Sequence, residues 1–210
     1  MSEESNKKKR FRNRIRRIKK QLKRYAEITE VGEIARRYFV MNAFDGALTT
    51  LGILIGFFLA GVTDPQIVVV TVLAGALAMG ISGLWGAFLA ESAERKRELK
   101  QLEHAMMADL SKSVMARASK FATIFSALID GLSPALAAVV GIIPFFFGVG
   151  TSTHFNTLFF ISIGLNLSVL FLLGMFLGRV SKENVFFMGL KVLTAGIVIT
   201  VLLFVLNLGH

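Results

Sequence analysis

Residues 66–90 of this chain read QIVVVTVLAGALAMGISGLWGAFLA. The stretch contains no charged residue, and it exceeds the roughly 20 residues that a helix needs to cross the hydrocarbon core of a bilayer. Because lipid offers no hydrogen-bond partners to backbone groups, an uninterrupted apolar run of this kind crosses a membrane as an α-helix. We therefore interpret residues 66–90 as a transmembrane helix.

Four further apolar runs lie in the 210-residue chain, which is 54% hydrophobic and only 18% charged. Together the runs predict five transmembrane helices, over residues 38–61, 66–90, 121–149, 155–178 and 187–208. The sequence thus predicts an all-α integral membrane protein. We expect no cleavable signal peptide, because a long basic segment precedes the first run.

The basic residues are unevenly distributed around these helices. Of the 24 Lys and Arg residues, fourteen precede Tyr38 and seven lie between Glu91 and Lys120, while Arg179, Lys182 and Lys191 are the remainder. The positive-inside rule then predicts a cytoplasmic N-terminus, a cytoplasmic 91–120 segment and an external C-terminus. The host membrane is the plasma membrane if the source is prokaryotic.

The same distribution divides the chain into four parts. Residues 1–37 form a basic segment, 38–90 carry the first two membrane helices, 91–120 form a charged helix and loop, and 121–208 carry the last three. Apolar residues recur in the basic segment at steps of four and three, which is typical of an amphipathic helix lying on the anionic lipids of the inner leaflet. The alternative is a disordered tail that only sets topology. The repeating residues are Phe11, Ile15, Ile18, Leu22 and Tyr25.

An internal repeat is visible between the predicted helices. Asp45-Gly46 with Gly56 in the first corresponds to Asp130-Gly131 with Gly141 in the third, at equal spacing. The pattern predicts a parallel repeat of two helices, 1–2 and 3–4, followed by a fifth helix, a plan that transporters use. Chance similarity between glycine-rich apolar helices is the alternative.

Two carboxylates fall inside the predicted spans, and intramembrane ionisable residues are functional candidates by default. Asn42, Asp45 and Thr49 are spaced three and four apart, so a helix presents their oxygens on one face to a passing cation. Asp130 is the second carboxylate. The structural alternatives are that Asp45 caps a helix break at Gly46 or binds a neighbouring helix, and that Asp130 caps or kinks its own helix.

A methionine in the second predicted helix adds a softer ligand. Met79 lies one turn from Ser82. A lone Met in a helix is normally a packing residue, but a thioether beside carboxylate oxygens favours a borderline transition metal over Ca²⁺ or Mg²⁺.

Acidic and sulfur-containing residues also follow the second helix, where they are interleaved with basic ones. One interpretation is a cluster that gathers divalent cations; the other is a set of solvated ion pairs such as Glu91 with Arg95. The candidate ligands are Glu91, Glu94, Glu98, Glu103, Met106 and Met107.

Other function classes receive little support from the sequence. The basic residues lie at the ends of apolar spans rather than on a soluble domain, which argues against nucleic-acid binding. The chain has no cysteine, its three histidines are scattered, and no nucleophile-and-base pattern or phosphate-binding glycine loop occurs. We therefore expect no enzymatic activity and no permanently bound cofactor.

Four features of the sequence resemble the vacuolar iron transporter family, which includes the plant vacuolar iron transporters and the yeast vacuolar iron and manganese importer. The resemblance covers about residues 35–208, and the chain looks like a short-loop, prokaryotic-type member. The features are Asp45-Gly46, Ala74-Gly75-Ala76-Leu77-Ala78-Met79, Gly141-Ile142-Ile143-Pro144, and a polar loop between helices two and three.

The resemblance implies a homodimer that moves Fe²⁺ or Mn²⁺ out of the cytosol, in exchange for protons. It implies that Asp45 and Met79 line the path. Three departures stand out: Thr71 occupies a position where many members have glutamate, the charged loop is short, and Asp130 is additional. The alternatives are a non-transporting scaffold or lipid-binding protein, and a carrier of another solute on the same fold.

Overall fold

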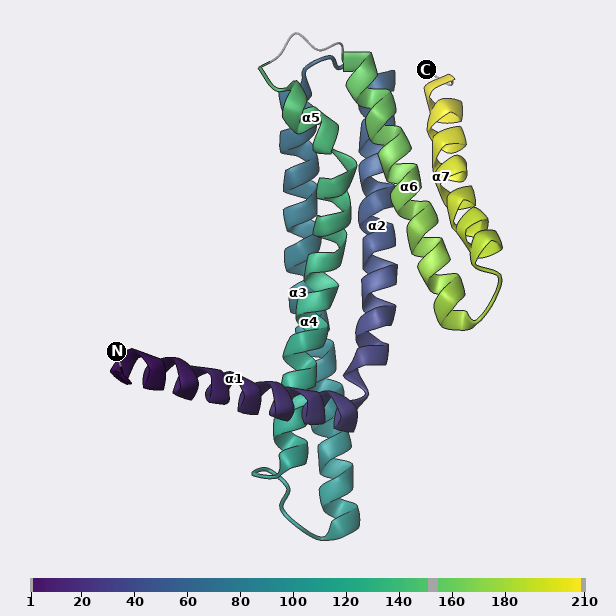
Figure 1. Ribbon diagram of the computed structural model, residues 1–210. Helices are drawn as coiled ribbons and strands as arrows, with labels where there is room; N and C mark the ends of the chain where they lie inside the picture. The colour runs from purple at the N-terminus through teal and green to yellow at the C-terminus, as the bar shows by residue number, and fades with distance from the viewer. Residues whose placement is uncertain (1, 151–154, 209–210) are drawn as a thin grey trace. The chain divides into compact units, whose positions relative to one another are not determined.

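The computed structural model describes residues 2–150 and 155–208, and every regular element in them is a helix (Figure 1). The all-α prediction is confirmed. The elements are α1 (Ser2–Thr29), α2 (Val31–Leu59), α3 (Pro65–Met106), α4 (Val114–Gly141), α5 (Ile143–Gly148), α6 (Phe155–Ser181) and α7 (Val185–Leu208).

Five of these helices, α2, α3, α4, α6 and α7, are long and apolar enough to cross a membrane. The predicted number of spans is therefore confirmed, although several helices begin or end at other residues than predicted. The second helix continues through the predicted charged helix to Met106. The third predicted span, 121–149, is broken at Ile142 into α4 and α5, and Pro144 lies in the first turn of α5, where a missing N–H leaves no helical bond unmade.

The chain forms two compact units. The first consists of Met1–Arg36 and Gly86–Leu128, and the second of Arg37–Trp85 and Ile129–His210. The second unit holds both buried hydrophobic clusters. In one cluster Leu54, Val72 and Phe145 pack together, and in the other Leu51 packs with Leu170.

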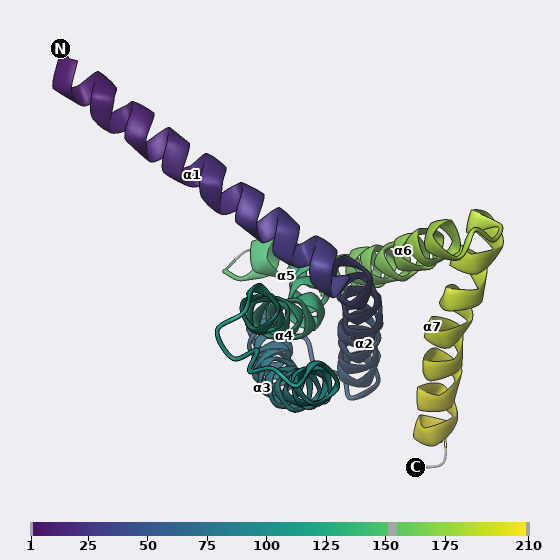
Figure 2. The same cartoon turned by 90° about the horizontal axis from the view of Figure 1, so that it is seen from below.

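Glycines bring helix backbones of the second unit into close approach. A Cβ atom on Gly46 of α2 would lie 2.2 Å from the carbonyl oxygen of Pro134 on α4. A Cβ atom on Gly131 of α4 would lie 2.6 Å from the carbonyl oxygen of Gly80 on α3. Small residues at such crossings let membrane helices associate through close packing. The end-on view shows α2, α3 and α4 as neighbours (Figure 2).

The last two spans form a helical hairpin. A Cβ atom on Gly174 of α6 would lie 2.8 Å from the Cα atom of Gly189 on α7, and one on Gly178 would lie 2.9 Å from the Cα atom of Val185. Only residues 182–184 connect the two helices. The Asn184 side chain accepts a hydrogen bond from the backbone N–H of Phe186 at 3.1 Å, which caps the start of α7.

The predicted repeat of two helices is not confirmed, and its matched positions have different surroundings. Asp45 is exposed, whereas Asp130 is buried. A Cβ atom on Gly56 would meet no atom within 4 Å, whereas one on Gly141 would meet the side chain of Asn166 at 2.4 Å.

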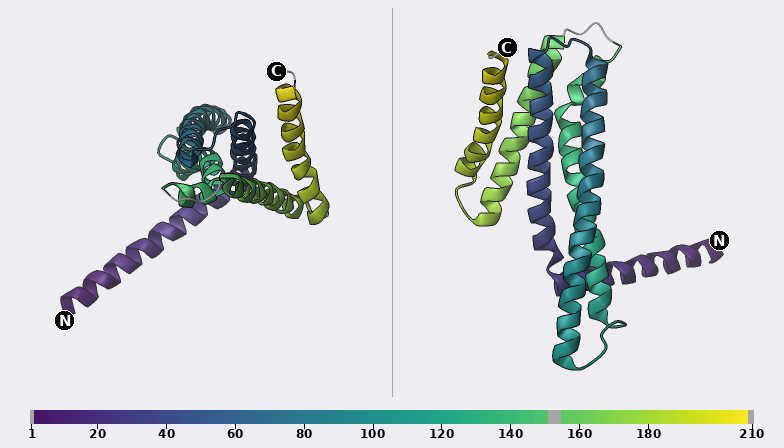
Figure 3. Two further views of the ribbon diagram at one scale, coloured as in Figure 1. Left: turned by 90° about the horizontal axis from the view of Figure 1, so that it is seen from above. Right: turned by 180° about the vertical axis from the view of Figure 1, so that it is seen from behind.

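In the first unit, α1 is one unbroken helix, visible in both views of Figure 3. A single residue, Glu30, separates it from α2 and adopts the left-handed conformation with a φ of 49°. The Tyr25 ring of α1 lies 6.2 Å from the Phe121 ring of α4, measured between centroids. The C-terminal end of α1 therefore packs against α4.

Candidate functional site

The buried carboxylate of Asp130 is enclosed by three helices of the second unit. The Nδ2 group of Asn42 on α2 donates a hydrogen bond of 2.5 Å to its Oδ1 atom. A Cβ atom on Gly83 of α3 would lie 2.9 Å from its Oδ2 atom, so the α3 backbone closes the other side. Asp130 thus lies where α2, α3 and α4 meet.

The proline after Asp130 leaves the helix continuous. Pro134 lies inside α4, and the Ser133 hydroxyl donates a hydrogen bond to the Ile129 carbonyl one turn earlier. Asp130 accepts a hydrogen bond from Asn42 on another helix. Its side chain therefore joins α2 to α4.

One side of α2 carries Asn42, Asp45 and Thr49, whose side chains differ in burial and in hydrogen bonding. The Asn42 amide donates to the Tyr38 carbonyl at 2.9 Å as well as to Asp130. These two bonds use both N–H groups of the amide, whose Oδ1 atom is an acceptor. Asp45 and Thr49 are exposed. On α3, Met79 is half-buried and Thr71 is exposed.

Within residues 2–150 and 155–208, no three His, Asp or Glu side chains are grouped closely enough to hold a metal ion. The intramembrane candidates supply carboxylate, amide, hydroxyl and thioether groups instead.

Arg95 of α3 forms ion pairs with two of the candidate glutamates that follow the second span. Its Nε atom lies 3.3 Å from an Oε2 atom of Glu91, and its Nη1 atom lies 3.9 Å from Glu98. The Glu91–Arg95 pair expected from the sequence is present, but the two side chains are only 12% and 11% exposed. This pair is therefore shielded rather than solvated, and it ties Glu91 to a structural contact.

Glu103 and the neighbouring Asp109 shape the loop between α3 and α4. Glu103 accepts a hydrogen bond from the Leu110 N–H at 2.9 Å, and Asp109 accepts one from the Ser111 N–H at 2.8 Å. The Ser111 backbone and side chain hold the pKa of the Asp109 carboxyl below its usual range. Glu94, Met106 and Met107 are exposed, and Met107 is 96% exposed with a φ of 49°.

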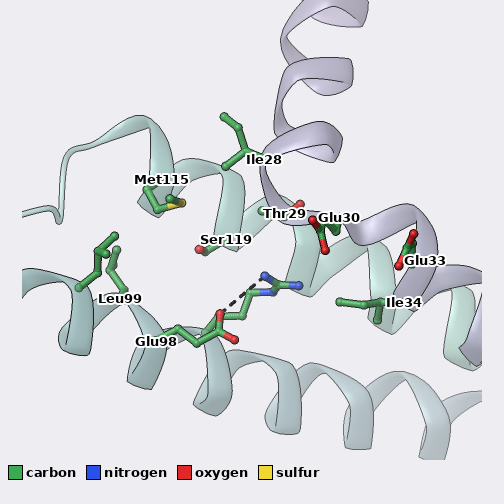
Figure 4. Close-up of a pocket in the computed structure, with 11 residues that line it drawn as sticks. Ile28, Thr29, Glu30, Glu33, Ile34, Glu98, Leu99, Met115 and Ser119 are labelled. Atoms are coloured by element: carbon green, nitrogen blue, oxygen red, sulfur yellow. Dashed lines mark ion pairs between the residues drawn. The ribbon is translucent and has the colours of Figure 1, made fainter.

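A cavity of about 450 Å³ lies in the first unit, between the α1–α2 junction, α3 and α4 (Figure 4). Glu30, Glu33, Glu98 and Arg95 contribute its charged side chains, and the rest of its lining is largely apolar. Two of the three carboxylates are paired, Glu98 with Arg95 at 3.9 Å and Glu33 with Arg36 at 3.8 Å.

Sequence reasoning did not single out Asn166 of α6, which is fully buried. Its Nδ2 group donates hydrogen bonds to the Gly141 carbonyl at 3.1 Å and the Ser162 carbonyl at 2.9 Å. The contact explains the glycine of the Gly141-Ile142-Ile143-Pro144 stretch, because a side chain at position 141 would overlap the amide. An asparagine within an apolar span was the available signal.

These features define a multi-pass helical membrane protein with carboxylate, amide and thioether groups within its spans. Residues 36–108 match the model of the VIT family, the family that the sequence features resemble. The chain is also 33% identical to Uncharacterized protein MJ0645 of Methanocaldococcus jannaschii over 179 residues, which covers 84% of this chain and 90% of that protein. The chain belongs to the VIT family, a family of transporters rather than enzymes.

Proposed function

We propose that the protein transports a divalent transition metal, Fe²⁺ or Mn²⁺, out of the cytosol in exchange for protons. The observation that carries this proposal is the exposed carboxylate of Asp45 on α2, within a candidate span. A carboxylate facing hydrocarbon costs several kcal/mol, or about 2.5–3.5 kcal/mol on insertion scales. Its position is understandable if the carboxylate contacts a hydrated cation path.

The exposed face of α2 that carries Asp45 also favours a homodimer. Met41, Asp45 and Thr49 follow one another at steps of four along α2, and all three are exposed in the single chain. A second copy placed against this face would remove Asp45 and Thr49 from lipid and would bring two carboxylates to one path. The proposed ion then meets ligands from both copies, which fits the absence of a three-residue His, Asp or Glu group in the described part of one chain.

The choice of metal rests on Met79. A thioether is a soft ligand that Mg²⁺ and Ca²⁺ do not favour, whereas carboxylate oxygens alone would accept them. Asp45 would supply the charge that attracts the cation, and Met79 would supply the preference for a transition metal. Asn42 and Thr49 would contribute neutral oxygens.

Thr71 occupies a position where many family members have glutamate. Asp130 would provide the second intramembrane carboxylate that this chain lacks there. It lies among α2, α3 and α4, and it is hydrogen-bonded to one of the proposed neutral ligands, Asn42. Of the residues after the second span, the exposed Glu94, Met106 and Met107 are better placed to gather metal than Glu91, which is shielded with Arg95.

Metal uptake into liposomes tests the proposal, with Fe²⁺, Mn²⁺, Zn²⁺ and an organic cation compared in the presence and absence of a pH gradient. Asp45→Asn should abolish uptake while leaving the protein folded, because the change removes an intramembrane charge and keeps the shape. Asp64→Asn is the matched control. The Asp64 side chain accepts a hydrogen bond from the Gln66 N–H at the start of α3, and asparagine caps helices equally well.

Met79→Leu should reduce uptake or weaken the preference for transition metals, since it removes the sulfur and keeps the apolar volume. Met188→Leu in α7 is the matched control, because Met188 packs against Gly178. Normal metal uptake by Asp45→Asn would refute the transport path. Loss of thermal stability with unchanged uptake would favour a helix-packing role, and uptake of the organic cation alone would assign another solute.

A further inference from the structure

α1 is a basic helix with an apolar stripe, and the proposed transport path does not use it. We propose that α1 is a docking surface for the anionic lipid headgroups of the membrane that holds the spans. Phosphate-bearing anionic lipids would bind its basic residues, and its apolar stripe would enter the boundary between headgroups and acyl chains. The inference does not depend on which solute the protein carries.

The charge of α1 is strongly one-sided. Ser2–Thr29 contains twelve Lys and Arg residues against three Glu residues. The structure describes the side chains of nine of these basic residues, and all nine are exposed. Among those nine, Lys23 forms an ion pair with Glu27 at 3.8 Å, and both side chains are well exposed. The helix thus presents a basic surface that its own acidic residues do not neutralise.

The apolar positions of α1 form one stripe along the helix. α1 is helical without interruption, so residues 11, 15, 18, 22 and 25 recur on one face. At the C-terminal end of the stripe, Tyr25 contacts Phe121. One turn earlier, Leu22 is 39% exposed. The stripe is therefore anchored at one end and uncovered at Leu22.

A bilayer with anionic headgroups would contact both the basic surface and the apolar stripe of this helix. Only Glu30 separates α1 from α2, a candidate membrane span, so the chain itself holds α1 close to a lipid surface. Each basic residue near an anionic surface contributes attraction, and the apolar stripe adds insertion. Nucleic acid would use the charge but not the stripe. A second α1 would use the stripe but would bring two strongly basic helices together.

Spin labels in the cysteine-free chain can test the proposal on the whole protein. Leu22→Cys places a label on the stripe, and Gln21→Cys, about 100° around the helix, is the matched control. Each labelled protein is placed in nanodiscs of phosphatidylcholine, with or without phosphatidylglycerol. The readout is the accessibility of the label to oxygen, which partitions into lipid, relative to a water-soluble nickel chelate.

We expect phosphatidylglycerol to raise the oxygen-to-nickel ratio at position 22 and to change it much less at position 21. High salt should reverse the rise, because the Debye length falls from about 8 Å at physiological ionic strength to about 3 Å at 1 M. Arg16→Gln and Lys20→Gln should each lower the ratio of lipid-bound to solvated helix by about fivefold at low salt. The affinity for lipid should therefore fall stepwise with charge.

Three results would overturn the proposal. An oxygen-to-nickel ratio at position 22 that is the same in both lipid mixtures would show that α1 does not bind anionic lipid. A short spin–spin distance between the two copies of position 22, present in both mixtures, would assign the stripe to a second copy of α1. Protection of position 22 by a DNA duplex but not by phosphatidylglycerol would assign the face to nucleic acid.

Discussion

The crossing of α2 and α4 allows a quantitative test of how tightly the spans pack. At Gly46, an added Cβ atom would lie 2.2 Å from the Pro134 carbonyl oxygen and 2.7 Å from the Pro134 Cα atom. These are backbone atoms, so no side-chain rotation relieves the overlap. An ordinary contact begins at 3.4 Å, so Gly46→Ala requires the two backbones to separate by about 1.2 Å, the difference between 3.4 and 2.2 Å.

That separation acts on the bond between Asn42 and Asp130, which lies about one turn away. The bond is 2.5 Å long, and a shift of the same size would carry it beyond the usual limit of about 3.2 Å. Overpacking costs about 1–3 kcal/mol, and an interhelical hydrogen bond within a membrane contributes about 0.6–1.7 kcal/mol. We therefore expect Gly46→Ala to lower the free energy of unfolding by about 2–4 kcal/mol and to impair metal uptake.

Unfolding in mixed micelles, titrated with a denaturing detergent, measures the free energy, and liposome flux measures uptake. Gly56→Ala in the same helix is the matched control, because its Cβ atom would meet nothing within 4 Å. Alanine there should be neutral or should stabilise the helix by up to about 1 kcal/mol. If Gly46→Ala unfolds at the same detergent concentration as Gly56→Ala, the close approach of α2 and α4 is wrong.

Three further predictions concern other parts of the chain. Gly141→Ala should destabilise the protein more than Gly164→Ala, because position 141 is filled by the Asn166 amide and position 164 is open; detergent unfolding compares them. Lowering the pH through the depressed pKa of Asp109 should lower the hydrogen-exchange protection factor of the Ser111 amide, which compares the observed rate with the intrinsic rate at the same pH. The carboxylate that accepts the Ser111 N–H is present above the ordinary pKa and is lost below the lowered one. Single cysteines at Ser5 and Ser111 should resist an impermeant reagent added to intact cells, and labelling of Ser111 from outside would contradict the predicted topology.

The number of spans was predictable because hydropathy is a local property of the sequence. Residues 66–90 contain no charge, and the continuation of that helix follows from its pattern of charged residues. The end of α4 at Gly141 was harder to predict. The sequence contains Pro134 and Pro144, and one lies inside a continuous helix while the other follows a break. Both prolines lack an N–H, so the residue type alone does not decide which of them accompanies a break.

The candidate site was predictable in its residue types and less so in its contacts. Two intramembrane carboxylates were identified, but the sequence did not show that Asn42 turns toward Asp130 while Asp45 stays exposed. Both outcomes depend on which helix lies beside which face of α2. The spacing of four residues predicted the ion pair of Glu91 with Arg95. It did not predict that both side chains are shielded from solvent, because that shielding comes from tertiary packing.

The hairpin of α6 and α7 has a consequence for how the protein is made. α7 emerges from the ribosome directly after α6, carries Lys191 within its apolar length, and has only 11% of its apolar stretch buried. The close approach of Gly174 and Gly178 to α7 gives this helix a partner that is synthesised immediately before it. Membrane insertion of the two helices as a pair would let α6 retain α7 in the bilayer. A chain truncated after Asn184 would expose the glycine face of α6 to lipid, and cellular quality control would have a surface to recognise.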